Sequence, residues 1–239
     1  MWKTIFIWII VLVAVPVCLT LLVERPLAAM ACPFCFGLEK LQDGVYVETS
    51  MSTETRAKLL KTLAESEARV TQFYGQMRYI PRVIVCATDA CYQHIGGGGA
   101  RVGSLGASLL LVAPQGIDAV LMSHELSHVE LYGRVGFWNM FLDVVPVWFN
   151  EGVAVLVSDD PAYLAPPHNG GDRCRVGPGE HMPVYPSEWR DRLQQDGQML
   201  YAEAACQVDY WVIANGGPAA VPALLDKLHA GQSFDSLYH

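Results

Sequence analysis

The chain has 239 residues, of which 52% are hydrophobic, and it carries a formal net charge of −8 at pH 7. This negative charge argues against a nucleic-acid-binding protein, because phosphate contacts need clustered Lys and Arg, and the apolar content excludes an intrinsically disordered chain. Only one long apolar run is present, which excludes a membrane protein with several spans.

The first predicted element is an uncharged run of 20 residues, 4–23, which follows Lys3. As a helix it is long enough to cross the roughly 30 Å core of a bilayer. We expect residues 1–31 to be an uncleaved transmembrane anchor, because the run is longer than the apolar core of most signal peptides. Two alternatives stay open: a cleaved signal peptide, since Ala29 and Ala31 form a cleavage-like pattern, and a lipoprotein modified at Cys32.

All three alternatives export residues 32–239 to the periplasmic or extracellular side, and the positive-inside rule keeps Lys3 in the cytoplasm. Seven cysteines are present, and six of them lie in the exported part: Cys32, Cys35, Cys86, Cys91, Cys174 and Cys206. An even number in an exported domain predicts disulfides. The short separations favour pairs 32–35 and 86–91, which leaves 174–206. A redox role for the C-x-x-C at 32–35 is disfavoured, because no βαβ unit surrounds it.

The hydrophobic pattern predicts an α+β domain with an N-terminal sheet and a helical C-terminal part. Gly75 and Gly133 are expected to end two of its helices. Residues 94–106 are predicted to form a glycine-rich loop, and 159–198 a long irregular segment. The expected strands are 45–49, 82–88 and 107–113, and the expected helices are 53–74, 117–132, 146–158, 200–214 and 218–230. Strands precede helices in this order, which indicates the α+β class and one domain over 32–239.

Residues 124–128 read His-Glu-Leu-Ser-His inside an apolar helical stretch. Positions four apart share a helix face, so His124 and His128 can direct their imidazoles at one metal ion. Glu125 lies beside them, where it can reach a water bound to that ion. Burying these groups together is costly unless they are paired or bind a metal. The motif therefore predicts a zinc site.

A hydrolytic zinc site usually has three protein ligands and one position for water. Glu151 is the best candidate for the third ligand, because it is an acidic residue inside the apolar run 145–157 and lies 23 residues after His128. A carboxylate in such a run needs a partner. We expect a second helix to bring it back to the two histidines.

These residues resemble a known family. The H-E-x-x-H at 124–128 followed by Trp-Phe-Asn-Glu-Gly-Val-Ala at 148–154 is similar to the gluzincin metallopeptidases of the peptidase MA-like group. The resemblance covers roughly residues 107–230 and implies a zincin-like fold. It implies that His124, His128 and Glu151 bind Zn²⁺, that Glu125 is the general base, and that Tyr201 hydrogen-bonds the oxyanion.

Two departures from the family refine the expected activity. The connection between the second histidine and Glu151 is longer than in the aminopeptidases of the family. Their substrate-binding strand carries a Glu that holds the substrate amine, and the strand expected to correspond here, 106–110, has no carboxylate. The resemblance therefore implies a peptidase that is not an aminopeptidase.

The sequence predicts a zinc peptidase of the cell envelope, tethered to the membrane by its N-terminal helix and acting on a peptide or protein. The alternative is a catalytically inactive envelope module of the same fold that binds a protein partner. An intact Glu125 favours the enzyme, because a purely structural zinc site needs no general base. No feature of the sequence indicates an oligomeric state.

Overall fold

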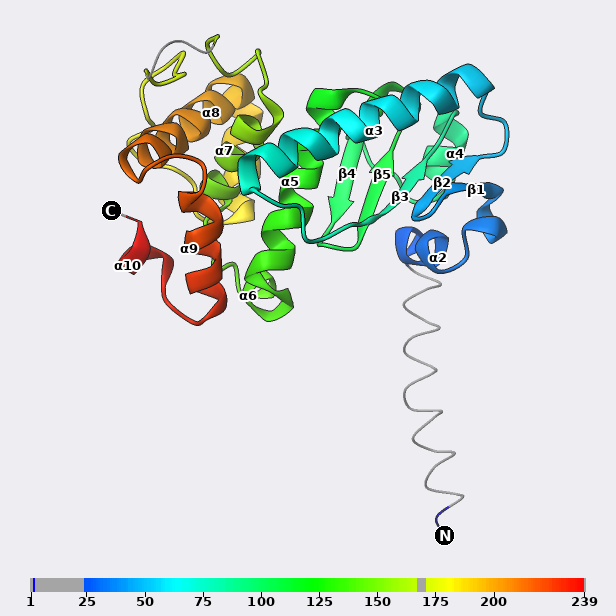
Figure 1. The fold of residues 1–239 in the computed structure, drawn as a ribbon, viewed down its shortest axis with the longest axis horizontal. Coiled ribbons are helices and arrows are strands. Elements are labelled where there is room, and N and C mark those ends of the chain that lie inside the picture. Colours follow the sequence, from blue (N-terminus) through cyan, green and yellow to red (C-terminus); the bar gives the residue numbers. More distant parts are fainter. Residues whose placement is uncertain (1, 3–23, 167–170, 239) are drawn as a thin grey trace.

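The computed structural model describes residues 24–166 and 171–238, together with residue 2. The predicted anchor at 4–23 lies outside these residues. Among the residues described, no helix combines the length and the apolar character needed to cross a bilayer. The fold is a mixture of α and β structure, with one sheet in the N-terminal half and a group of helices in the C-terminal half (Figure 1). The expected α+β class is confirmed.

The sheet has five strands in the order β1-β2-β3-β5-β4. The central strands β2, β3 and β5 are parallel, and both edge strands are antiparallel to their neighbours. The predicted strands are confirmed as β2, β3 and β5, whereas the two edge strands were not predicted. The bounds are β1 Leu38–Gln42, β2 Val45–Glu48, β3 Arg82–Val85, β4 Val102–Leu105 and β5 Leu109–Val112.

Side chains alternate across the strands, so each face of the sheet buries its own set. One face packs against α3 (Thr53–Tyr74) and α5 (Ala119–Val135) and carries Val47, Val85 and Val112. The other face is covered by α2 (Arg25–Ala31), by the 3-10 turn at Pro33–Phe36 and by α4 (Asp89–His94). The glycine-rich stretch 94–106 was expected to be a loop throughout. It begins at the last residue of α4 and contains the edge strand β4.

Helix α5 extends beyond its predicted end. It begins after Asp118, whose side chain accepts hydrogen bonds from the backbone N–H groups of the first turn, and it ends at Gly136, where φ is +89°. Gly133 lies inside the helix. A Cβ there would lie 2.2 Å from the ring of Tyr79, so this glycine permits close packing and does not end the helix.

Five helices follow α5 in the described part of the chain. Their bounds are α6 Phe137–Phe141, α7 Val147–Ser158, α8 Pro186–Ala214, α9 Ala220–His229 and α10 Phe234–Leu237. Helix α7 confirms the prediction at 146–158. The prediction of an irregular segment up to residue 198 is wrong, because α8 begins at Pro186. Glu188 accepts hydrogen bonds from the N–H groups of Val184 and Tyr185 at 3.1 and 3.3 Å, and Trp189 is buried, so both residues stabilise this first turn.

The three predicted disulfides are confirmed: Cys32–Cys35, Cys86–Cys91 and Cys174–Cys206. Such pairs are typical of an oxidising, exported environment. The bond at Cys32 contradicts the lipoprotein alternative, because the lipid would need the same sulfur atom. The third bond ties the segment before α8 to that helix.

Candidate metal centre

Two adjacent helices bring the predicted ligands together. His124 and His128 lie one turn apart on α5, and Glu151 lies in the first turns of α7, which packs against α5. Glu151 Oε2 is 3.3 Å from His124 Nε2 and 3.6 Å from His128 Nε2. The three ligand atoms all lie within 4.8 Å of one another, so they can bind one metal ion.

The charges of this cluster suit a cation. Burial raises the pKa of the Glu151 carboxyl. The charge of His128 and the contact with His124 lower this pKa by more, so the net pKa is below its usual value. Burial lowers the pKa of His124. The contact of His124 with Glu151 raises this pKa by more, so the net pKa is above its usual value. Apart from these two imidazole contacts, Glu151 Oε2 is buried and accepts no hydrogen bond from any described residue. A buried carboxylate oxygen in this state is costly unless a cation satisfies it.

Asn150 and Tyr132 orient the second histidine. Asn150 Nδ2 donates to the Tyr132 hydroxyl at 2.9 Å, which directs Asn150 Oδ1 to His128 Nδ1 at 2.8 Å. Nδ1 of His128 is therefore the protonated nitrogen, and Nε2 is left free to bind a metal. Neither residue was predicted to act at the site. Tyr132 lies four residues after His128, as His128 lies four residues after His124. This spacing could have identified Tyr132 as a residue on the same helix face.

Glu125 lies beside the ligands but is not one of them. Ser104 Oγ of β4 donates to Glu125 Oε2 at 2.7 Å. Glu125 and His124 line one groove together with Tyr163 and Tyr201. The predicted general base therefore faces a groove that the candidate ligand His124 also lines, and edge strand β4 holds it there. Ser104 was not predicted, because the strand that carries it was expected to be a loop.

Tyr201 reaches the same groove from α8. Its ring centroid is 6.2 Å from that of His124, and its ring stacks on Tyr163 at 5.1 Å. Burial, followed by the charge of Glu151, raises the pKa of the Tyr201 hydroxyl well above its usual value. The hydroxyl therefore stays protonated at neutral pH and is able to donate a hydrogen bond.

The strand along this groove is β4, whereas 106–110, which was expected to form one strand, is a turn followed by the first residues of β5. Gly106 to Ser108 form the turn after β4, and Leu109 and Leu110 are buried in β5. β4 is an edge strand because it pairs only with β5, to which it is antiparallel, and α5, which carries the two histidines, packs beside it.

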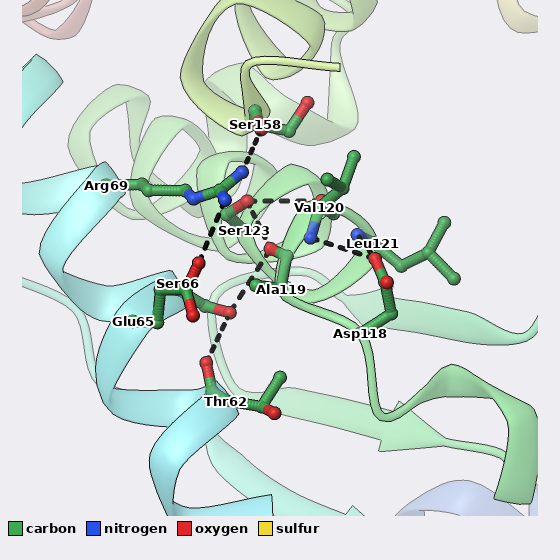
Figure 2. A network of polar contacts seen from close by, with 10 residues as sticks. All are labelled: Thr62, Glu65, Ser66, Arg69, Asp118, Ala119, Val120, Leu121, Ser123 and Ser158. Carbon is green, nitrogen blue, oxygen red and sulfur yellow. Dashed lines mark hydrogen bonds and ion pairs between the residues drawn. The ribbon is translucent and has the colours of Figure 1, made fainter. Parts of the chain in front are cut away.

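Polar contacts connect α3 to both helices that carry the candidate ligands. Figure 2 shows that the Ser66 hydroxyl of α3 donates to the carbonyl of Thr62 at 2.8 Å and lies 3.3 Å from the carbonyl of Ala119 at the start of α5. Arg69 of α3 donates to the carbonyl of Ser158 at the end of α7. Asp118 caps α5 through the N–H groups of Val120 and Leu121. Helices α5 and α7 are thus tied to a common support.

A second group of possible ligands in the described part consists of Glu48, Cys86 and Cys91. It is unsuited to a metal, because the two cysteines form a disulfide. Comparisons with protein-family models, curated proteins and solved structures give no significant match to this chain. A possible metal site of two histidines and one glutamate is therefore what the structure itself supports.

Proposed function

We propose that the chain is a zinc-dependent peptidase of the gluzincin type, with a zincin-like domain exported to the cell envelope. One observation carries the proposal. Glu125 faces the groove beside His124, outside the triad of possible ligands, and Ser104 holds its carboxylate there. A metal site that only stabilises the fold has no use for such a carboxylate.

The donor set fits zinc. Two imidazoles and one carboxylate are the ligands of several hydrolytic zinc sites, and three protein ligands leave a position open. Oε2 of Glu151 is buried and has only the two imidazoles beside it, so a cation held between them would pair with this atom. Bound Zn²⁺ lowers the pKa of a coordinated water to about 7 and polarises a carbonyl.

Three residues of the chain would then each have a separate role in peptide hydrolysis. Glu125 accepts the proton of the attacking water and passes it to the leaving amine. Ser104 holds the carboxylate in reach of the groove by its 2.7 Å hydrogen bond. Tyr201, whose hydroxyl stays protonated, donates to the developing oxyanion, an effect of about 3 kcal/mol for one donor in comparable sites.

Edge strand β4 offers a place for an extended peptide. The carbonyl of Arg101 accepts a hydrogen bond from Ala113 N at 2.8 Å. Because backbone groups alternate in an antiparallel ladder, the N–H and C=O groups of Val102 and Ser104 point away from β5. A substrate strand could pair with them. The strand carries no carboxylate to bind a free amine, which favours an endopeptidase.

Zinc content and proteolysis test the proposal on the full chain in detergent. We expect close to one zinc per chain in the parent and a clear loss in Glu151→Ala. We expect Glu125→Gln to keep its zinc and lose the cleavage of an unstructured protein substrate. Zinc binding with no cleavage in the parent would favour the alternative module that binds a protein partner. A folded parent that takes up no zinc would contradict the metal site.

A further inference from the structure

Helix α6, Phe137–Phe141, exposes an apolar surface with no functional explanation so far. Phe137, Trp138, Phe141 and Leu142 are 66%, 73%, 73% and 69% exposed. Their spacing of one and four residues places them on one side of a helical turn. We call these four residues the α6 surface. Large apolar side chains gathered in this way usually mark a contact with a protein or a membrane.

The opposite side of α6 holds the helix in place. Asn139 Nδ2 donates to the carbonyls of Val135 at 3.1 Å and Leu228 at 3.3 Å. Met140 lines one cavity together with Tyr132 and Asn150, and a second one together with Leu27 and Met30. The α6 surface is therefore presented outward by a helix whose polar and sulfur-containing side chains are bound to the domain.

The α6 surface lies on the same side of the molecule as the start of the described domain. Leu27 and Met30 of α2 line an apolar cavity of about 460 Å³ together with Phe137 and Met140. Figure 1 shows α2 and α6 along one side of the fold. Helix α2 begins two residues after the uncharged run 4–23. An anchor formed by that run would hold this side of the domain at the bilayer.

We propose that the α6 surface inserts into the lipid headgroup region and is a second membrane contact of the exported domain. Trp and Phe favour the interface, where an amphipathic element lies in the membrane plane. A second copy of the chain fits less well, because a specific protein interface uses roughly 20–30 residues a side, whereas α6 has five. The proposal does not depend on peptidase activity.

Photolabelling of the full chain tests this contact. The protein is reconstituted into vesicles of phosphatidylcholine and phosphatidylglycerol that contain a diazirine-bearing phospholipid, and labelled peptides are identified by mass spectrometry. We expect label on the peptide that carries residues 137–142. Ile213 on α8 is also exposed, at 47%, and provides the internal comparison. We expect its peptide to remain at background.

The variant F137S/W138S/F141S should lose the label on α6, because these side chains are removed from the lipid. These positions are exposed, so the variant should fold, and unchanged circular dichroism and zinc content would verify this. The matched control Ile213→Ser should leave the labelling of α6 as in the parent. Labelling of α6 no stronger than that of the Ile213 peptide would overturn the proposal. So would a chemical cross-link between two α6 surfaces, with lipid label absent, because it would assign the surface to a dimer.

Discussion

His128 Nδ1 and Asn150 Oδ1 lie 2.8 Å apart, and this contact joins the two helices that carry the candidate metal ligands. Asn150 directly precedes Glu151 on α7, so one turn of helix supplies both a ligand and the group that orients another ligand. The amide is itself held by its 2.9 Å bond to Tyr132. The site is therefore a connected unit, in which His128 cannot rotate without breaking a buried hydrogen bond.

Asn150→Ala should weaken zinc binding by about 10–100-fold, the usual effect of removing a group that orients a metal ligand. The imidazole of His128 loses the acceptor that selects its tautomer. Competition with a chromophoric chelator measures the affinity. Tyr132→Phe is the matched control, since it keeps the contact between Asn150 and His128 and should cost less. Equal affinity in the parent and in Asn150→Ala would show that the histidine needs no such support.

Gly152 permits the close packing of α7 on α8. A Cβ at this position would lie 2.5 Å from the carbonyl oxygen of Ala204 and 2.7 Å from Cγ2 of Val208. Gly152→Ala should therefore separate the helices and lower the free energy of unfolding by about 1–3 kcal/mol, as overpacking does. Urea denaturation measures this change, and zinc affinity should fall with it, because Glu151 moves with α7.

Gly177→Ala is the control for this substitution, because no atom lies within 4 Å of the added Cβ. Its unfolding midpoint should match that of the parent. If Gly152→Ala unfolds at the same urea concentration as the parent, the two helices do not need a glycine at their contact.

The candidate ligands could be predicted because their signal is local. A spacing of four residues places two histidines on one helix face, and an acidic residue in an apolar run needs a partner. Both arguments use only neighbouring residues, and the structure brings His124, His128 and Glu151 together. The same holds for helix α3, whose stripe and end at Gly75 follow from its own sequence.

Features that depend on contacts distant in sequence could not be predicted. Gly133 was expected to end α5. It lies inside the helix instead, and a glycine is needed there because Tyr79 from another segment packs against the helix at this position. Strand β4 contains two polar or glycine residues among four, so its sequence lacks the usual strand pattern, and pairing with β5 makes it a strand. Ser104 acquires its contact with Glu125 only through that pairing.

Glu130 and Arg134 form a buried ion pair in α5, with a nitrogen–oxygen distance of 2.6 Å and side-chain exposures of 0% and 2%. Glu130 also accepts hydrogen bonds from the N–H groups of Arg78 and Tyr79. Glu130→Ala should lower the free energy of unfolding by about 3–5 kcal/mol, because it leaves a buried guanidinium without its partner. Thermal and urea denaturation measure this loss.

The surface pair Glu65–Arg69 on α3 has the same i,i+4 spacing and is the matched control, since its side chains are 50% and 27% exposed. Glu65→Ala should change the free energy of unfolding by less than about 1 kcal/mol. Equal losses in the Glu130 and Glu65 variants would show that burial does not determine the contribution of the Glu130–Arg134 pair.

Glu48 should make the stability of the sheet depend on pH. Burial raises the pKa of its carboxyl. Hydrogen bonds from Ser50, Ala87 and Thr88 lower this pKa by more, so the net pKa is below the usual value. A carboxyl of this kind stabilises the fold above its pKa in the unfolded chain, about 4.3. This contribution is lost as the pH falls through the lower pKa of the folded state.

Glu48→Gln should therefore be less stable than the parent at pH 7 by about 1 kcal/mol, and the difference should shrink progressively below about pH 4.3. Urea denaturation of both proteins at several pH values from neutral to acidic measures this difference. The exposed carboxyl of Glu54, in the first turn of α3, offers the control Glu54→Gln. A difference for Glu48→Gln that is constant across the acidic range would contradict this role, because it would assign the loss to the shape of the side chain and not to its charge.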